Sequence, residues 1–200
     1  MRFRLRIAGR AAAPPRLILA PIIALVATTL VISLAMADVR RYAIQTEASE
    51  LGFKATSRLM NADGRFHRFR GDVAVDPRDL ATARINLSIE AASIDTGIGL
   101  RDTHLRSADF FDAERFPTIT FESQRVEAEG RRATVTGRLT VRGVTREIAV
   151  PVDVAVSDVA LVASGEIVMN RRDYGMVYNS FVNPIGNEVR VSFTIRARVS

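Results

Sequence analysis

The chain of 200 residues has no cysteine, no tryptophan, two histidines and a single lysine, Lys54. Without cysteine it can form no disulfide, no thiolate metal site and no cysteine nucleophile. The two histidines, His67 and His104, are too few for a histidine metal site, and the acidic residues do not follow the spacing of a calcium-binding loop. The composition therefore predicts a protein that holds no metal ion.

The formal net charge of +6 comes mostly from the start of the chain. Residues 1–37 hold five of the 28 basic side chains and no acid, so the rest of the chain carries 23 basic side chains against 22 acidic ones. A nearly neutral domain has no electrostatic basis for non-specific binding to nucleic acid. We therefore expect no nucleic-acid partner.

Residues 1–37 have the features of a targeting segment. Arginines at the start are followed by an apolar run over residues 17–34, and Ala35-Met36-Ala37 precedes Asp38. Small residues at the first and third positions before a cut after Ala37 are typical of a secretory signal peptide. The apolar run, about 18 residues long, also reaches the lower limit for an uncleaved membrane anchor. We expect a signal peptidase to cleave the chain after Ala37. Whether residues 1–37 are cleaved or remain as an anchor, we expect the domain of residues 38–200 to lie outside the cytoplasm.

Most of the remaining chain alternates between apolar and polar side chains with a period of two. The pattern is clearest in residues 51–59, 83–91, 135–142, 148–156 and 189–199. Such alternation is typical of antiparallel strands with one buried face. About eight strands joined by short turns predict an all-β fold, either a sandwich or an up-and-down barrel.

Residues 93–121 interrupt this alternation. Leu100, His104 and Leu105 fall at helical spacing, which predicts a short helix that Thr96 or Thr103 would cap. Phe110 and Phe111 follow it and are too apolar to remain in water. We therefore expect this segment to cover one open end of the β-structure.

Alternation alone does not distinguish a solid sandwich from a hollow barrel. An eight-stranded antiparallel barrel can hold one small ligand in its interior. Small residues recur on the apolar faces and favour a hollow interior, although ordinary close packing around large neighbours explains them equally well. They are Ala55, Ser57, Ala83, Gly137, Ala163 and Gly165.

Several stretches resemble the YceI-like family: residues 93–123, residues 136–147 (TGRLTVRGVTRE) and residues 66–76, which with Gly64 fit the family pattern Gly-x-Phe-x-x-Phe-x-Gly. The resemblance extends over residues 40–200. It implies a periplasmic, lipocalin-like antiparallel barrel. Together with the strands and helix expected from the residues, the predicted fold is an eight-stranded barrel with a short helix over one end. The resemblance also implies a polyisoprenoid or similar long-chain amphiphile in the lumen, and no catalysis. The chain departs from the family at Gln45 and Ala48-Ser49, where Asp and His-Ser are common, so the headgroup preference stays open.

Large apolar side chains, read together with this resemblance, predict the lining of the lumen. The predicted lining residues are Phe53, Ala55, Phe69, Leu87, Phe110, Phe111, Phe121, Leu139, Met169, Met176 and Phe181. Arg101, Asp102 and His104 are predicted at the mouth. Arg101 and Asp102 either bind a polar headgroup or pair with each other to tie the helix to the barrel, and we favour the pair because buried charges need partners.

Two functions from different classes are consistent with the sequence. The first is a carrier that holds an isoprenoid lipid, such as a polyprenyl species or a quinone, with no other cofactor. The second is a ligand-free β-domain that docks on a membrane or respiratory partner, as a monomer or a dimer. An esterase acting on such lipids is a third and weaker hypothesis, because the chain has no Gly-x-Ser-x-Gly motif.

Overall fold

The computed structural model describes residues 38–200, and the expected signal peptide, residues 1–37, lies outside them. No helix within the described residues is long and apolar enough to cross a membrane. One α-helix, α1 (Gly99–Arg106), accompanies eleven strand segments. These are β1 (Arg40–Ile44), β2 (Glu50–Ser57), β3 (Ala62–Phe66), β4 (Phe69–Asp76), β5 (Asp79–Glu90), β6 (Ile94–Asp95), β7 (Thr118–Glu129), β8 (Arg132–Val141), β9 (Val144–Val156), β10 (Ala160–Asn170) and β11 (Ile185–Val199).

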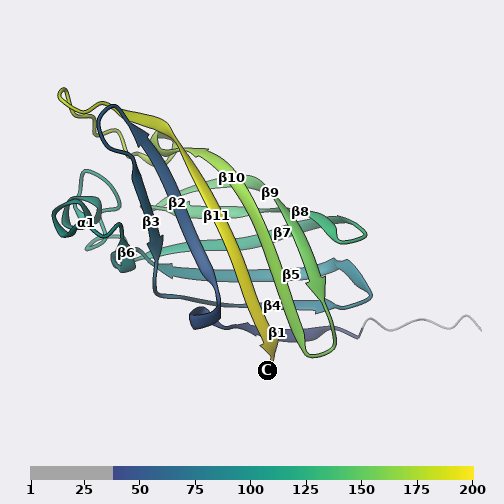
Figure 1. Ribbon diagram of the computed structural model, residues 1–200. Helices are drawn as coiled ribbons and strands as arrows, with labels where there is room; N and C mark the ends of the chain where they lie inside the picture. The colour runs from purple at the N-terminus through teal and green to yellow at the C-terminus, as the bar shows by residue number, and fades with distance from the viewer. Residues whose placement is uncertain (1–37) are drawn as a thin grey trace, which may run out of the picture. The chain divides into compact units, whose positions relative to one another are not determined.

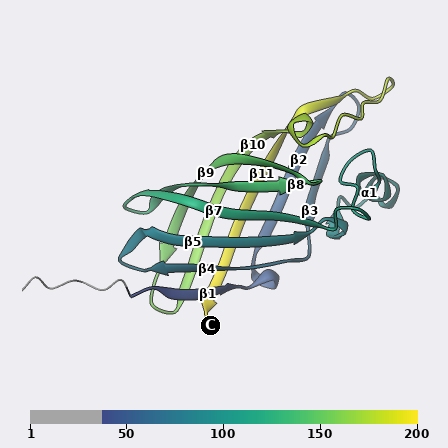
Figure 2. The ribbon, with the colours of Figure 1, turned by 180° about the vertical axis from the view of Figure 1, so that it is seen from behind.

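The strands close into a barrel (Figures 1 and 2). Neighbours in the ring follow the order β1-β4-β5-β7-β8-β9-β10-β11, and every pairing is antiparallel. The last strand meets the first through the pairs Tyr42↔Val199 and Ile44↔Ala197, which leaves no open edge in the ring. The predicted eight-stranded antiparallel barrel is confirmed.

Three of the eight strands are interrupted by short turns and then continue beside the same neighbour. β1 and β2 both pair with β11 and are separated by a 3-10 turn, η1 (Thr46–Ala48). β5 and β6 are separated in the same way by η2 (Ala91–Ser93). β3 and β4 together form the strand that lies between the β1–β2 strand and the β5–β6 strand. β3 pairs with β2 and β6, and β4 pairs with β1 and β5. The eleven segments therefore form eight long strands.

Residues of β8 show how the alternation builds the barrel wall. Ala133, Val135 and Leu139 are buried and face the interior. Arg138, between two inward positions, faces solvent and pairs with Glu122 of the neighbouring strand at 2.9 Å. The period-two pattern thus separates an apolar interior from a polar outer surface, as the sequence predicts.

The segment of α1 lies at one end of the barrel (Figure 1). Phe110, just after the helix, is 7% exposed, and the ring of Phe111 packs edge-on against Phe66 at a centroid distance of 5.7 Å. The predicted short helix over one end is confirmed. The helix begins at Gly99 without a side-chain cap, so the predicted capping by Thr96 or Thr103 is wrong.

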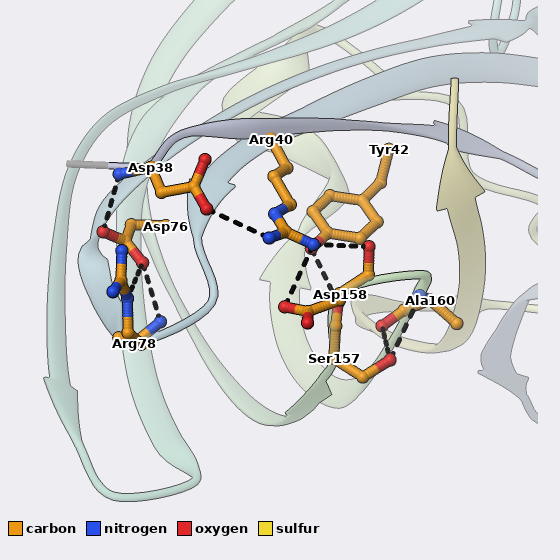
Figure 3. A network of polar contacts seen from close by, with 8 residues as sticks. All are labelled: Asp38, Arg40, Tyr42, Asp76, Arg78, Ser157, Asp158 and Ala160. Carbon is orange, nitrogen blue, oxygen red and sulfur yellow. Dashed lines mark hydrogen bonds and ion pairs between the residues drawn. The ribbon is translucent and has the colours of Figure 1, made fainter.

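A network of polar contacts holds the opposite end, which we call the network end (Figure 3). Tyr42 of β1 is fully buried and donates its hydroxyl to a backbone carbonyl of the β9–β10 turn at 2.7 Å. Arg40 pairs with Asp158 in the same turn at 3.0 Å. The amide of Asp38 donates to the Asp76 carboxylate, at the β4–β5 turn, at 3.0 Å. These contacts join the start of β1 to two turns that are distant in sequence.

Candidate ligand cavity

The interior of the barrel is hollow. A cavity of roughly 540 Å³ lies beneath α1, lined by strands β2, β3, β5, β7, β8, β9, β10 and β11. Inward-facing rings such as Phe53, Phe66 and Phe193 keep part of their surface accessible because they face this space. Met60 and Leu100 line the cavity and are also exposed, so the cavity opens to the surface between the β2–β3 turn and the start of α1. We call this opening the mouth.

Most of the predicted lining residues do line the cavity: Phe53, Ala55, Leu87, Phe110, Phe111, Phe121, Leu139, Met169 and Met176. Two predicted residues lie elsewhere. Phe69 is 6% exposed and packs in the core beside the cavity wall. Phe181 is 99% exposed, because residues 177–184 form a loop outside the barrel rather than part of a strand.

The sequence analysis missed other lining residues. Val191 and Phe193 line the cavity from β11, and the alternation of residues 189–199 already placed them on an apolar face. Tyr178 and Arg171 also line it, and no periodic pattern marked either residue. Their positions depend on the loop between β10 and β11, which the sequence alone does not position.

Phe121 and Phe193, together with Leu51, Leu87 and Val150, form the floor of the cavity. Phe121 and Phe193 line both the large cavity and a smaller one of roughly 150 Å³ toward the network end. Each ring lies against a glycine: a Cβ atom at Gly137 would come within 2.6 Å of the Phe121 ring, and one at Gly165 within 2.7 Å of the Phe193 ring. Gly137 and Gly165, two of the small residues noted in the sequence, therefore leave the space that the Phe121 and Phe193 rings occupy.

Arg101 and Asp102 do not form the expected ion pair with each other. Asp102 is 6% exposed and accepts hydrogen bonds from the amide of Thr96 at 2.9 Å and from its hydroxyl at 2.5 Å. Arg101 donates to the same hydroxyl at 2.8 Å and to the Thr96 carbonyl at 3.0 Å. Both residues therefore hold α1 in place through Thr96, which is consistent with the structural role that we favoured. The predicted ion pair between Arg101 and Asp102 is wrong.

His104 connects the helix to the loop before β11. Its Nε2 atom lies 2.8 Å from the carboxylate of Asp109. Its ring stacks edge-on against Phe110 and Tyr178, at centroid distances of 5.0 Å and 4.8 Å. Within residues 38–200 no three histidine and acidic side chains converge on a possible metal position.

Arg171 is the one deeply buried cation of the cavity wall. It belongs to a 3-10 turn, η3 (Arg171–Tyr174), and is 4% exposed. Its guanidinium donates to the backbone carbonyls of Gly186 at 2.9 Å, of Ile185 at 3.2 Å and of Met176. No carboxylate in the described part of the chain pairs with it. Burial lowers the pKa of this arginine, although a guanidinium remains charged in proteins.

Sequence comparisons connect this barrel to known proteins. The family model of the YceI-like domain matches residues 42–197. A UPF0312 protein of Vibrio parahaemolyticus is 35% identical over 133 residues, which cover 63% of this chain and 70% of that protein. A UPF0312 protein of Pseudomonas aeruginosa is 40% identical over 87 residues, 44% of this chain and 46% of that protein. The chain thus spans about half the length of such Pseudomonas relatives.

Solved structures share the fold. BcnA of Burkholderia cenocepacia superposes with a TM-score of 0.71 and is 25% identical, over 76% of this chain and 98% of that chain. A polyisoprenoid binding domain from Saccharophagus degradans superposes with a TM-score of 0.66 at 19% identity, over 80% of this chain and 98% of that chain. At 19% identity the second likeness shows the fold alone.

Proposed function

Because this chain belongs to the YceI-like domain family, we propose that it binds a polyisoprenoid or a similar long-chain amphiphilic lipid inside its barrel. The observation that carries the proposal is the apolar cavity of roughly 540 Å³ that opens at one end. This volume falls within the range of small-molecule sites, about 300–1,000 Å³. The name of the Saccharophagus protein, a polyisoprenoid binding domain, agrees with this choice of ligand.

The cavity has the polarity of a site for an amphiphile. Its deep wall is formed by side chains such as Phe121, Leu139 and Met169, and its polar side chains gather nearer the mouth, where His104 and Tyr178 lie. Each methylene group of a lipid chain that leaves water for such a wall contributes about 0.8 kcal/mol to binding. The tail therefore points toward the floor of the cavity and the headgroup toward the mouth.

The charged side chains of the wall favour a headgroup that accepts hydrogen bonds. The wall contains Arg101 and Arg171 and no aspartate or glutamate. A guanidinium has five N–H groups, and Arg171 uses its Nε, Nη1 and Nη2 atoms on three carbonyls. The remaining N–H groups suit a phosphate or a quinone carbonyl, whereas a cationic headgroup would be repelled.

The proposed role is that of a non-enzymatic carrier in the periplasm. Cleavage after Ala37 would make the nitrogen of Asp38 an α-ammonium group, and this nitrogen already lies 3.0 Å from the Asp76 carboxylate. That contact supports a mature chain that begins at Asp38, because the new positive charge would meet a partner. We expect the intact mass of the exported protein, measured by mass spectrometry, to equal that of a chain that begins at Asp38.

Organic extraction of the purified protein, followed by mass spectrometry, tests the ligand. We expect an isoprenoid lipid that is absent from an identical extract of an unrelated periplasmic protein prepared in parallel. If no lipid is found and neither a quinone nor a polyprenyl phosphate binds when added, the proposal is wrong. The ligand-free interaction module would then be favoured.

A further inference from the structure

Large apolar side chains stand exposed around the mouth. They come from the β2–β3 turn, the start of α1 and the loop before β11, and we call them the mouth rim: Leu59, Met60, Ile98, Leu100, Val177, Phe181 and Val182. Phe181 is 99% exposed and Leu100 is 88% exposed, so both side chains contact almost nothing in their own chain. Among residues 38–200 every other large apolar side chain that is exposed is a valine. Such patches mark interaction sites.

Hydrogen bonds hold the three segments of the mouth rim together. The amide of Leu59 donates to the side-chain oxygen of Asn183 at 2.9 Å, which joins the β2–β3 turn to the loop before β11. Arg101 donates from Nη1 to the carbonyl of Asn61 at 3.1 Å, which joins α1 to the same turn. The segments therefore form one surface, and the cavity opens within it.

The charged side chains within the mouth-rim segments are both arginines. Residues 58–61, 96–101 and 175–187 contain Arg58 and Arg101 and no acidic residue. The acids Asp63, Asp95, Asp102 and Glu188 flank these segments, so the absence of acids applies to the rim segments themselves. A surface of this kind is attracted to anionic lipid headgroups.

We propose that the mouth rim docks on the surface of a lipid bilayer that contains anionic lipids, with Phe181 and Leu100 inserted at the headgroup boundary. Apolar insertion and electrostatic attraction act together in such binding. The inference rests on the proposed function, since a long-chain lipid enters and leaves the cavity most directly through a membrane. A protein partner fits less well, because a protein covering the rim would also cover the opening.

Single cysteines can test this docking because the chain has none of its own. Val182→Cys labels the mouth rim at a position that is 72% exposed, and Val159→Cys labels the network end at a position that is 65% exposed. The exported chain, purified without residues 1–37, carries an environment-sensitive dye at either position and is mixed with vesicles of phosphatidylethanolamine and phosphatidylglycerol. We expect the dye emission at position 182 to rise severalfold and shift to shorter wavelengths, while that at position 159 stays unchanged.

Removal of the apolar side chains provides the second measurement. Phe181→Ser combined with Leu100→Ser, in the Val182→Cys background, should lower the vesicle response at least about tenfold. The melting temperature should stay unchanged because both side chains lie outside the core. A response that survives this double substitution, or that is equal at positions 182 and 159, would overturn the docking.

Lipid extraction from the same preparations separates this inference from the proposed function. A dye response at position 182 without any extractable or bindable lipid would overturn the proposed function and support the docking. Bound lipid with no vesicle response would overturn the docking alone. A response that follows protein concentration instead of vesicle concentration would identify a second copy as the occupant and also overturn it.

Discussion

Arg40 at the network end and Arg171 at the mouth end are held in opposite ways. At the network end Arg40 pairs with the carboxylates of Asp38 and Asp158, each at 3.0 Å (Figure 3). At the mouth end Arg171 donates only to backbone carbonyls, and Arg106 donates to the carbonyls of Ala92 and Ile94. Both arrangements fix loops in place, but only the first neutralises the charge.

This difference has a functional consequence. A carbonyl carries a partial charge, so an arginine held by carbonyls still presents most of its positive charge to its surroundings. The cavity wall therefore presents the cations Arg101 and Arg171 without a carboxylate of its own, whereas Arg40 at the network end is neutralised by Asp38 and Asp158. The same barrel thus has one end tied together by ion pairs and one end at which the cavity opens.

The largest expected effect comes from filling the large cavity. Ala55 lines it, and Ala55→Phe places a ring in the space that lipid would occupy. We expect the variant to purify without lipid and to melt close to the lipid-free wild type. Extraction and thermal melting of the same preparation measure both outcomes.

The matched control lies in the small cavity at the network end. Ala163→Phe adds the same ring to a space of roughly 150 Å³, where overpacking should cost about 1–3 kcal/mol of unfolding free energy. Its lipid content should match that of the wild type. Equal lipid loss in both variants would show that the two cavities do not differ in function.

A large loss of stability is expected when the buried arginine is removed. Arg171→Met leaves three carbonyls without their donor, which should lower the unfolding free energy by about 3–5 kcal/mol. The neighbouring Arg172 is exposed, so Arg172→Met should change it by less than about 0.5 kcal/mol. Urea unfolding measures both. If the two variants unfold alike, Arg171 does not fasten the loop before β11.

A smaller effect is expected at the floor of the cavity. Phe193→Leu replaces one of the two aromatic rings of the floor with a smaller side chain and should lower the unfolding free energy by about 1 kcal/mol. The shorter side chain connects the large cavity with the small one, so the co-purified lipids should shift toward longer chains. Mass spectrometry of the extracts measures this shift, and Val168→Leu on the same sheet, an exposed position, is the control. An unchanged length distribution would show that Phe193 does not limit the tail.

Much of the fold was predictable from the sequence because burial of one strand face leaves a period-two pattern. The apolar face of residues 189–199 predicted β11 and, with it, the inward position of Phe193. The interruption at Thr46–Ala48 was not predicted, although the apolar positions change from even-numbered residues (Tyr42, Ile44) to odd-numbered ones (Leu51, Phe53) across it.

The site was only partly predictable for a related reason. Hydrophobicity alone grouped Phe110, which lines the cavity, with Phe181, which lies in a loop and faces solvent. Arg171 carries no periodic signal, since its role depends on carbonyls at residues 176, 185 and 186 that reach it only in the folded chain. Period-two alternation predicts strands, whereas the mouth is formed by loops and by the helix α1.

The smallest expected effect is a change in acid sensitivity at the network end. Asp76 accepts hydrogen bonds from the amide of Arg78 at 2.9 Å, from its Nε at 3.2 Å and from the amide of Asp38 at 3.0 Å, and these bonds lower the pKa of its carboxyl group. A carboxyl group with a lowered folded-state pKa stabilises the protein above its unfolded pKa, about 3.9 for aspartate, and the stabilisation is lost as the pH falls through the folded-state value.

Asp76→Asn should therefore be less stable than the wild type at about pH 7, and the difference should shrink as the pH falls below about 4. Urea unfolding at both pH values measures this, with Asp79→Asn at the exposed side of the same turn as the control. A difference that is the same at both pH values would mean that the shape of Asp76, and not its charge, holds the network end together.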